Sequence, residues 1–223
     1  MIPFIWIVVL FLVLGAVGIL LTIFFATFRQ RARMARSLDI QMLQVLLPKD
    51  IEVEEREEGI GEPIKERIAV AEQFLSTLAV LHRSSLERFI YGSPVIVFEI
   101  VARPNGGIVF YAGTERTYID HLEKQIYAHY PEAEVTIAKE FTMFHPEDAI
   151  SVASLSLRKK NYLPIATYKE LEVDPMQALT GALAKIRDTD AAMIQYVFQA
   201  ASKKEQRRAS LAASRTIRGK QAD

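Results

Sequence analysis

Residues 2–28 carry no charged side chain, and this run constrains the chain more than any other feature. Of the 22 residues from Phe4 to Phe25, 17 are Leu, Ile, Phe or Val. A membrane-spanning helix needs about 20 mainly apolar residues. At roughly −0.3 to −0.6 kcal/mol for each such residue, insertion into a bilayer gains at most about 5–10 kcal/mol. We therefore expect residues 1–28 to form a transmembrane anchor.

The positive charge that follows the apolar run predicts its orientation. No Lys or Arg precedes the run, whereas Arg29, Arg31, Arg33 and Arg36 follow it within eight residues. Because basic residues remain on the cytoplasmic side, we expect the N-terminus outside the inner (plasma) membrane and the rest of the chain inside. The same four arginines form a basic juxtamembrane segment, 29–36, that suits anionic lipid. A cleaved signal peptide needs a basic start, a shorter apolar core and a small-residue cleavage site, and the run has none of these.

The rest of the chain, roughly 195 residues, is long enough for one domain with its own core. Cysteine is absent, which excludes disulfides, thiolate metal sites and cysteine nucleophiles and agrees with a cytoplasmic body. The net charge is zero but unevenly distributed. An acidic stretch, Asp50–Glu58, is predicted to be an exposed loop, and residues 202–223 a basic tail that forms a frayed helix or a linker.

Apolar periodicity predicts alternating strands and helices after residue 37. The expected order is strand, helix, strand, strand, helix, strand, which is the ferredoxin-like βαββαβ arrangement. Asn105 and Gly106 suit a hairpin turn between the middle strands, and Thr114 is expected to cap the second helix. The predicted elements are Ser37–Leu47, Glu62–Leu81, Pro94–Arg103, Gly107–Gly113, Glu115–Tyr130 and Ala133–Lys139.

A further β-α-β unit is predicted after this domain. It consists of a strand over Ile150–Lys159, a helix opened by Asp174 and Pro175, and a strand over Ala191–Ala200. The fold class is therefore α+β: one transmembrane helix, then a ferredoxin-like antiparallel sheet domain over residues 37–201, extended by this unit.

No residue pattern in the chain is typical of a catalytic or cofactor site. His121 and His129 lie eight residues apart on one predicted helix, whereas zinc helices place their ligands three or four residues apart. Asp120 and Glu123 could act as an acid–base pair, but solvent-facing carboxylates of an amphipathic helix are the simpler interpretation. The remaining histidines, His82 and His145, fall in predicted loops.

Nucleotide and nucleic-acid binding also lack support in the sequence. The one Gly-rich loop, Asn105-Gly106-Gly107, joins strand to strand, whereas a phosphate-binding loop joins strand to helix. The arginines at 29–36 lie at the membrane edge, where lipid contact explains them. The basic tail leaves lipid, nucleic acid, an acidic partner surface and simple solubility open, although its lack of Tyr and Phe gives base stacking no support. We therefore expect no cofactor and no metal.

Several stretches, taken in order, resemble the N-terminal region of predicted type IV secretion or conjugative-transfer ATPases of candidate-phyla bacteria. Long members of that family continue into a motor domain that hydrolyses ATP, but the chain has no Walker motif, so the motor activity does not carry over. The chain is then either a separate anchor subunit or part of a longer ATPase. The resemblance covers nearly all of 37–202 and rests on "SLDIQMLQVLLPKD", "IAVAEQFLSTLAVL", "GSPVIVFEIVARPNGGIVFYAGTERTYIDHLEKQIYAHYPEAEV", "YLPIATYKELEVDPMQALTGALAKI" and "AAMIQYVFQAAS".

The function that the resemblance and the anchor together imply is a non-catalytic assembly or tethering module. Its expected partners are the bilayer and either a transfer ATPase or further copies of the chain. The alternative is a membrane-tethered small-ligand or regulatory binding domain unrelated to secretion, which rests on fold analogy.

Overall fold

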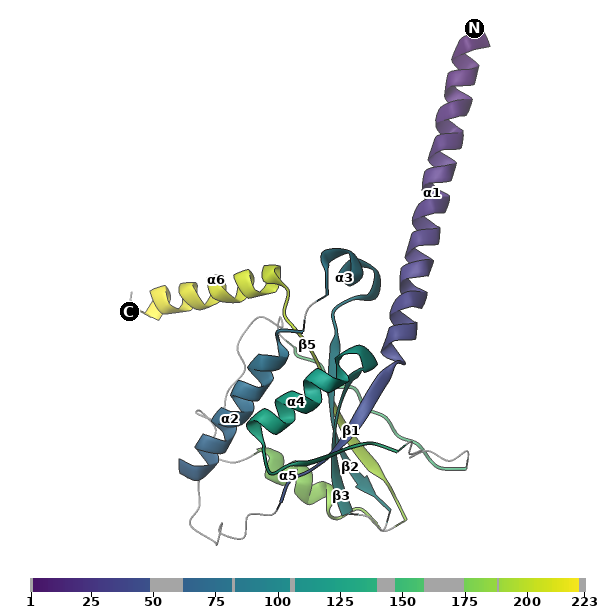
Figure 1. The fold of residues 1–223 in the computed structure, drawn as a ribbon. Coiled ribbons are helices and arrows are strands. Elements are labelled where there is room, and N and C mark those ends of the chain that lie inside the picture. The colour runs from purple at the N-terminus through teal and green to yellow at the C-terminus, as the bar shows by residue number, and fades with distance from the viewer. Residues whose placement is uncertain are drawn as a thin grey trace.

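A single long helix projects from a mixed body of helices and strands in the computed structural model of the chain (Figure 1). This N-terminal helix, α1, spans Ile2–Ser37 and has a mean hydropathy of 2.8 in its most apolar window, none of which is buried in the protein. It is long and apolar enough to span a membrane. The structure describes residues 2–48, 62–81, 83–104, 107–139, 147–158, 175–187 and 189–220.

Only two residues separate α1 from the first strand of the sheet, β1 (Ile40–Leu46). The Asp39 N–H donates to the Arg36 carbonyl at 3.1 Å, which closes the last turn of the helix. Asp39 is held in turn by Arg116, whose backbone N–H donates to the Asp39 carbonyl at 3.2 Å and whose Nε lies 3.1 Å from Asp39 Oδ1. The helix is therefore joined to the sheet without an intervening loop.

The sheet has the ferredoxin-like strand order, with one added strand. Its strands β2 (Val95–Arg103), β3 (Gly107–Glu115) and β4 (Glu134–Ile137) join β1 in the order β4-β1-β3-β2, and every pairing is antiparallel. A fifth strand, β5 (Ala192–Gln199), pairs with β2 and forms the other edge. The α+β class and the ferredoxin-like core are thus confirmed.

Three helices pack on the same face of this sheet. They are α2 (Glu62–Leu78), α4 (Ile119–His129), which follows a short 3-10 turn at Arg116–Tyr118, and α5 (Pro175–Leu183). Because strand side chains alternate between faces, Ile96, Ile100 and Ala102 of β2 share one face. Ile96 lies in the cluster under α2 and α4, while Leu183 of α5 packs on Ile100 and Ala102. The main core consists of Leu43, Phe74, Leu78, Leu81, Ile96, Ala112, Leu122, Ile126, Ala133 and Val135.

The predicted strand over Ile150–Lys159 is wrong for the part of it that the structure describes. Residues 150–158 have no strand structure, and Val152 and Leu155 are 84% and 98% exposed. The four apolar residues Ile150, Val152, Leu155 and Leu157 are all more than half exposed, so this segment gains little from apolar burial within the described structure. Within the described residues, the extension of the core therefore consists of one helix and one strand, α5 and β5.

The predicted cap of the second helix is also wrong. Thr114 lies fully buried in β3, and its hydroxyl donates to the Val95 carbonyl of β2 at 2.8 Å. The helix begins later, at Ile119, after the 3-10 turn, and no side chain caps it. A hydroxyl that already has a cross-strand partner is not available to a helix start, and periodicity alone does not reveal this.

Several element ends differ from the predictions. The first strand starts at Ile40 because α1 continues to Ser37, and α2 ends at Leu78 rather than Leu81. On α2, Phe74 is buried and Leu75 is exposed, and on α4 Leu122 and Ile126 are buried. The acidic stretch, the hairpin residues Asn105 and Gly106, and the Asp174 cap lie outside the described residues.

Candidate functional site

A short helix, α3 (Ser85–Tyr91), lies beside the C-terminal part of α1 (Figure 1). This helix was not predicted from the sequence. It begins with a capping box: the Glu87 N–H donates to Ser84 Oγ at 3.2 Å, and the Ser84 N–H donates to Glu87 Oε2 at 3.1 Å. It ends at Gly92, whose φ of 85° favours glycine. The S-x-x-E spacing followed by this glycine was the sequence signal for α3.

The first arginine of the basic segment attaches α1 to α3. Arg29 Nε donates to the Phe89 carbonyl at 3.0 Å, and the Arg29 guanidinium lies 4.0 Å from the centre of the Phe89 ring. A cation over an aromatic face at this distance is attracted by the ring quadrupole, by about 0.5–1 kcal/mol at exposed sites. One residue before the end of α1, Arg36 lies 5.0 Å from the centre of the Tyr91 ring. The C-terminal half of α3 therefore contacts α1 through two arginines.

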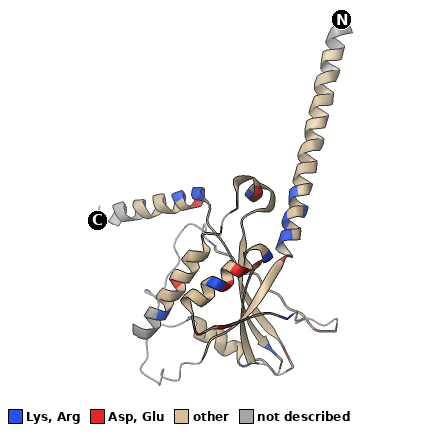
Figure 2. Ribbon diagram, in the orientation of Figure 1, with Lys and Arg blue, Asp and Glu red and all other residues tan. Residues whose placement is uncertain are grey.

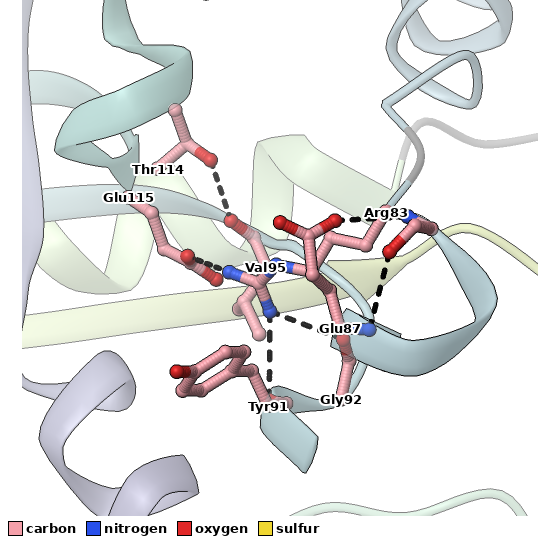
Figure 3. Close-up of polar contacts among 8 residues, drawn as sticks. Arg83, Glu87, Tyr91, Gly92, Val95, Thr114 and Glu115 are labelled. Carbon is pink, nitrogen blue, oxygen red and sulfur yellow. Dashed lines mark hydrogen bonds and ion pairs between the residues drawn. The ribbon is translucent and has the colours of Figure 1, made fainter. Parts of the chain in front are cut away.

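A buried ion pair supports α3 from the side of the sheet. Arg83, just before α3, forms an ion pair and hydrogen bond with Glu115 at the end of β3 (Figure 3). The two side chains are only 5% and 4% exposed. Arg83 Nη1 also donates to the Gly92 carbonyl at 3.0 Å, so one guanidinium links β3 to the loop that follows α3. Buried charges persist in proteins when they are paired and hydrogen-bonded in this way.

A pocket of about 440 Å³ lies where the C-terminal end of α1 meets α3 and the adjoining ends of the strands. Arg33 and Arg36 reach it from α1 and Arg88 from α3, while Tyr91, Ser93 and Glu115 form other parts of its wall. Glu115 is the one acid among the described lining residues, and Arg83 already neutralises it. The pocket therefore carries an excess of positive charge and suits an anionic group.

The structure separates the four predicted arginines into different environments. Arg33 and Arg36 lie together in the pocket, and Arg29 is held on α3. The Arg31 side chain has no hydrogen bond, ion pair or ring contact within the described part of the chain. Sequence reasoning missed Arg83 and Arg88, since they are more than 45 residues away and only the fold brings them to α1.

The histidines and carboxylates of α4 do not come together as a site. The His129 ring packs on Phe74, and its Nδ1 lies 2.9 Å from the Gln125 carbonyl, so this histidine has a hydrogen-bond partner on its own helix. His121 is half-buried, and its Nε2 has no hydrogen-bond partner in the described structure. Asp120 is exposed. No group of three or more His, Asp or Glu able to hold a metal occurs among the described residues, and His82 and His145 lie outside them.

The basic tail forms a helix rather than a linker. This helix, α6 (Lys203–Lys220), starts with its own capping box, in which the Glu205 N–H donates to Ser202 Oγ at 3.3 Å and the Ser202 N–H donates to Glu205 Oε2 at 2.8 Å. It extends away from the body and across the direction of α1 (Figures 1 and 2). The exposed bases Lys203, Lys204, Arg207, Arg208 and Arg215 lie within about 140° of its circumference at 100° per residue.

Together these features define a ferredoxin-like α+β domain attached without a loop to an N-terminal helix that is able to span a membrane, with a basic pocket at the junction. The chain belongs to the family described as a domain of unknown function, DUF8128, whose sequence model matches residues 62–221. No curated protein and no solved structure matches the chain.

Proposed function

We propose that the chain is a non-catalytic, membrane-anchored assembly module that holds a type IV secretion or conjugative-transfer-like ATPase at the cytoplasmic face of the inner membrane. The observation that supports this most directly is the junction between α1 and β1. Two residues join the anchor to the sheet, and Arg116 and Arg29 hold the two parts together. A loosely tethered domain would be free to reorient, whereas this connection fixes the body relative to the bilayer.

The partner in this proposal comes from the family resemblance, and two structural features are compatible with it. Among the described strands, β4 and β5 form the two edges of the sheet, and an edge strand can pair with another strand or with a second copy of the chain. Helix α6 extends away from the body and carries exposed bases, some of them at the end nearest the body (Figure 2). A basic, solvent-exposed helix fits an acidic surface on a partner and accelerates association by electrostatic steering.

The test is recovery of nucleotide hydrolysis with the intact chain. The full chain, tagged at its C-terminus, is purified in a mild detergent from membranes of cells that express it naturally, and Mg²⁺-dependent ATP hydrolysis is measured in the eluate. We expect activity with the chain but none with a tagged single-span protein of unrelated sequence, which serves as the control. The absence of any hydrolysing partner, with the chain itself intact and abundant, would contradict the proposal.

A second candidate function is a membrane-tethered domain that binds a small soluble anion, and the basic pocket is the observation that favours it. Arg33, Arg36 and Arg88 converge there from two separate elements. Isothermal titration of the detergent-solubilised chain with soluble phosphate esters distinguishes the two candidates. Saturable binding that Arg88→Gln abolishes would support the second candidate, whereas the tethering proposal requires no such ligand.

A further inference from the structure

The basic pocket lies at the depth of a phospholipid headgroup if α1 spans the membrane. Phe28 is the last residue of the apolar run, and Arg33 follows it by five residues, about 7.5 Å along the helix axis. The headgroup layer of each leaflet is about 5–8 Å thick, judged from the difference between the hydrocarbon core and the whole bilayer. The Arg33 guanidinium therefore falls at the level of the lipid phosphates rather than in bulk water.

The guanidinium groups in the pocket are available to a ligand. Within the described residues, Arg33, Arg36 and Arg88 form no ion pair. Arg36 lies 5.0 Å from the Tyr91 ring. Hydrogen bonds with Ser84 and, less strongly, the charge of Arg36 lower the pKa of the exposed Glu87 carboxyl, which does not line the pocket. Arginine presents a planar fork of N–H donors that matches two oxygens of one phosphate, and three such groups surround the cavity. The one acid in the described wall, Glu115, is already committed to Arg83, so it does not repel an incoming anion.

Helix α3 adds an apolar surface that a soluble anion would not require. Leu86 and Phe89 lie three residues apart, on one side of the helix, and are 70% and 53% exposed. Phe89 is held by Arg29, which immediately follows the apolar run, so this side of α3 lies at the boundary between the apolar and headgroup layers. An aromatic and an aliphatic side chain at this depth are typical of helices that lie in the membrane interface.

We propose that this pocket binds the phosphate of an anionic phospholipid of the inner leaflet, with Arg33, Arg36 and Arg88 around the phosphate and with Leu86 and Phe89 in the adjoining interface. The inference rests on the membrane anchoring in the proposed function, but it does not require the ATPase partner. The volume of about 440 Å³ suits a headgroup, while the acyl chains remain in the bilayer beside α1. Basic pockets beside transmembrane helices on the cytoplasmic side bind anionic headgroups in the same way.

The test is native mass spectrometry of the full chain in a neutral detergent, titrated with phosphatidylglycerol. Arg88 is the informative position because it lies on α3, outside the basic run of α1. We expect Arg88→Gln to weaken lipid binding about tenfold, since a charge-assisted hydrogen bond to phosphate is lost. Arg31→Gln is the matched control: it removes the same charge from the basic run, and Arg31 does not line the pocket, so binding should change less than about twofold.

Two further ligands, together with the comparison of the two variants, decide between a lipid site and other interpretations. Phosphatidylcholine should bind more weakly than phosphatidylglycerol, and soluble glycerol phosphate more weakly still, because it lacks the contact with Leu86 and Phe89. Equal weakening by Arg88→Gln and Arg31→Gln would overturn the proposal in favour of diffuse electrostatic attraction. Binding of glycerol phosphate as tight as that of the lipid would also overturn it, in favour of a soluble anion.

Two controls keep these outcomes interpretable. An unchanged circular dichroism spectrum shows that Arg88→Gln is folded, and Arg88→Lys should restore only part of the binding because lysine lacks the planar fork. Failure to recover an ATPase with the chain would contradict tethering and leave the lipid measurement unaffected.

Discussion

At the residue scale, the ion pair between Arg83 and Glu115 determines where α3 lies. A buried pair adds little net stability compared with apolar side chains, because both charges lose their hydration. The pair instead fixes the position of α3, because Arg83 contacts Glu115 on β3 and the Gly92 carbonyl at the same time. The position of α3, and with it the pocket wall that Arg88 and Tyr91 form, therefore depends on two buried charges.

Replacement of one member of this pair should be strongly destabilising. Glu115→Gln leaves the Arg83 charge buried without a counter-ion, and we expect the free energy of unfolding to fall by about 3–5 kcal/mol. Guanidinium titration of the detergent-solubilised chain, followed by far-UV circular dichroism, measures this. Arg187→Gln is the control, since Arg187 is largely exposed in its pair with Asp190 and its loss should have little effect. Equal effects of the two substitutions would refute the role given to burial.

Two glycines should respond to alanine in opposite directions. At Gly113, in β3, a Cβ would lie 3.0 Å from the Gln41 carbonyl and inside contact distance of the Met42 sulfur, so Gly113→Ala should destabilise the chain by about 1–3 kcal/mol. At Gly181, in α5, nothing lies within 4 Å, so Gly181→Ala should stabilise by about 0.5–1 kcal/mol. Thermal unfolding of both variants under identical conditions tests the sign of each effect.

At the element scale, the seven-residue helix α3 depends on its contacts with the rest of the protein for its stability. Its capping box satisfies two backbone donors, and Gly92 ends it. A helix this short is not stable alone, so its contacts with Arg29 and Arg36 of α1 and its attachment through Arg83 hold it in place. The capping box and Gly92 define where α3 begins and ends, whereas its tertiary contacts make the helix stable.

The capping box predicts a specific dependence of stability on pH. Hydrogen bonds from Ser84 hold the pKa of Glu87 below its usual value of 4.5. The folded state thus favours the carboxylate, so this contribution to stability is fully present above that value and is lost as the pH falls through the lower folded-state pKa. The Glu87→Gln variant has no carboxylate at this position, so it should lack this pH-dependent contribution to the free energy of unfolding at every pH. The difference in melting temperature between wild type and variant should therefore shrink between about pH 5 and pH 3, and a constant difference would contradict the assignment.

The sequence predicts an element well where a local apolar periodicity determines its structure. It predicts less where contacts between residues far apart in the sequence determine the structure. The apolar run, the apolar periodicity over Glu115–Tyr130 and that of the strands predict α1, α4 and the ferredoxin-like order, because each pattern is local. Thr114 was misassigned because its partner, Val95, is 19 residues away. The pocket shows the same limit: Arg33 and Arg36 follow from the basic run, whereas Arg88 joins them only through the fold.

At the scale of the whole molecule, the apolar helix α1 and the body form one continuous unit. Helix α1 continues through its basic end directly into β1, while α6 lies across the direction of α1 (Figure 1). If α1 stands along the membrane normal, α6 lies roughly along the membrane plane. The orientation of the chain in the membrane therefore decides which solvent compartment both α6 and the sheet edges face.

The predicted orientation can be measured with single cysteines, because the natural chain has none. We expect an impermeant thiol reagent to label Ile2→Cys in intact spheroplasts and to label Ser210→Cys, on α6, only after permeabilisation. The physical basis is the excess of arginine on the C-terminal side of the apolar run. Labelling of Ser210→Cys but not Ile2→Cys in intact spheroplasts would reverse the orientation and contradict a cytoplasmic ATPase as the partner.

The two-residue junction at Leu38 and Asp39 has a mechanical consequence. A spanning helix changes its tilt when the thickness of the surrounding bilayer changes. Since no loop absorbs that rotation, a change of tilt in α1 must swing β1, and with it the whole sheet, through a comparable angle. The distance of the sheet edges from the bilayer would then vary with lipid chain length. If α1 spans the bilayer, the thickness of that bilayer would thereby set the distance between the membrane and any protein bound to the sheet.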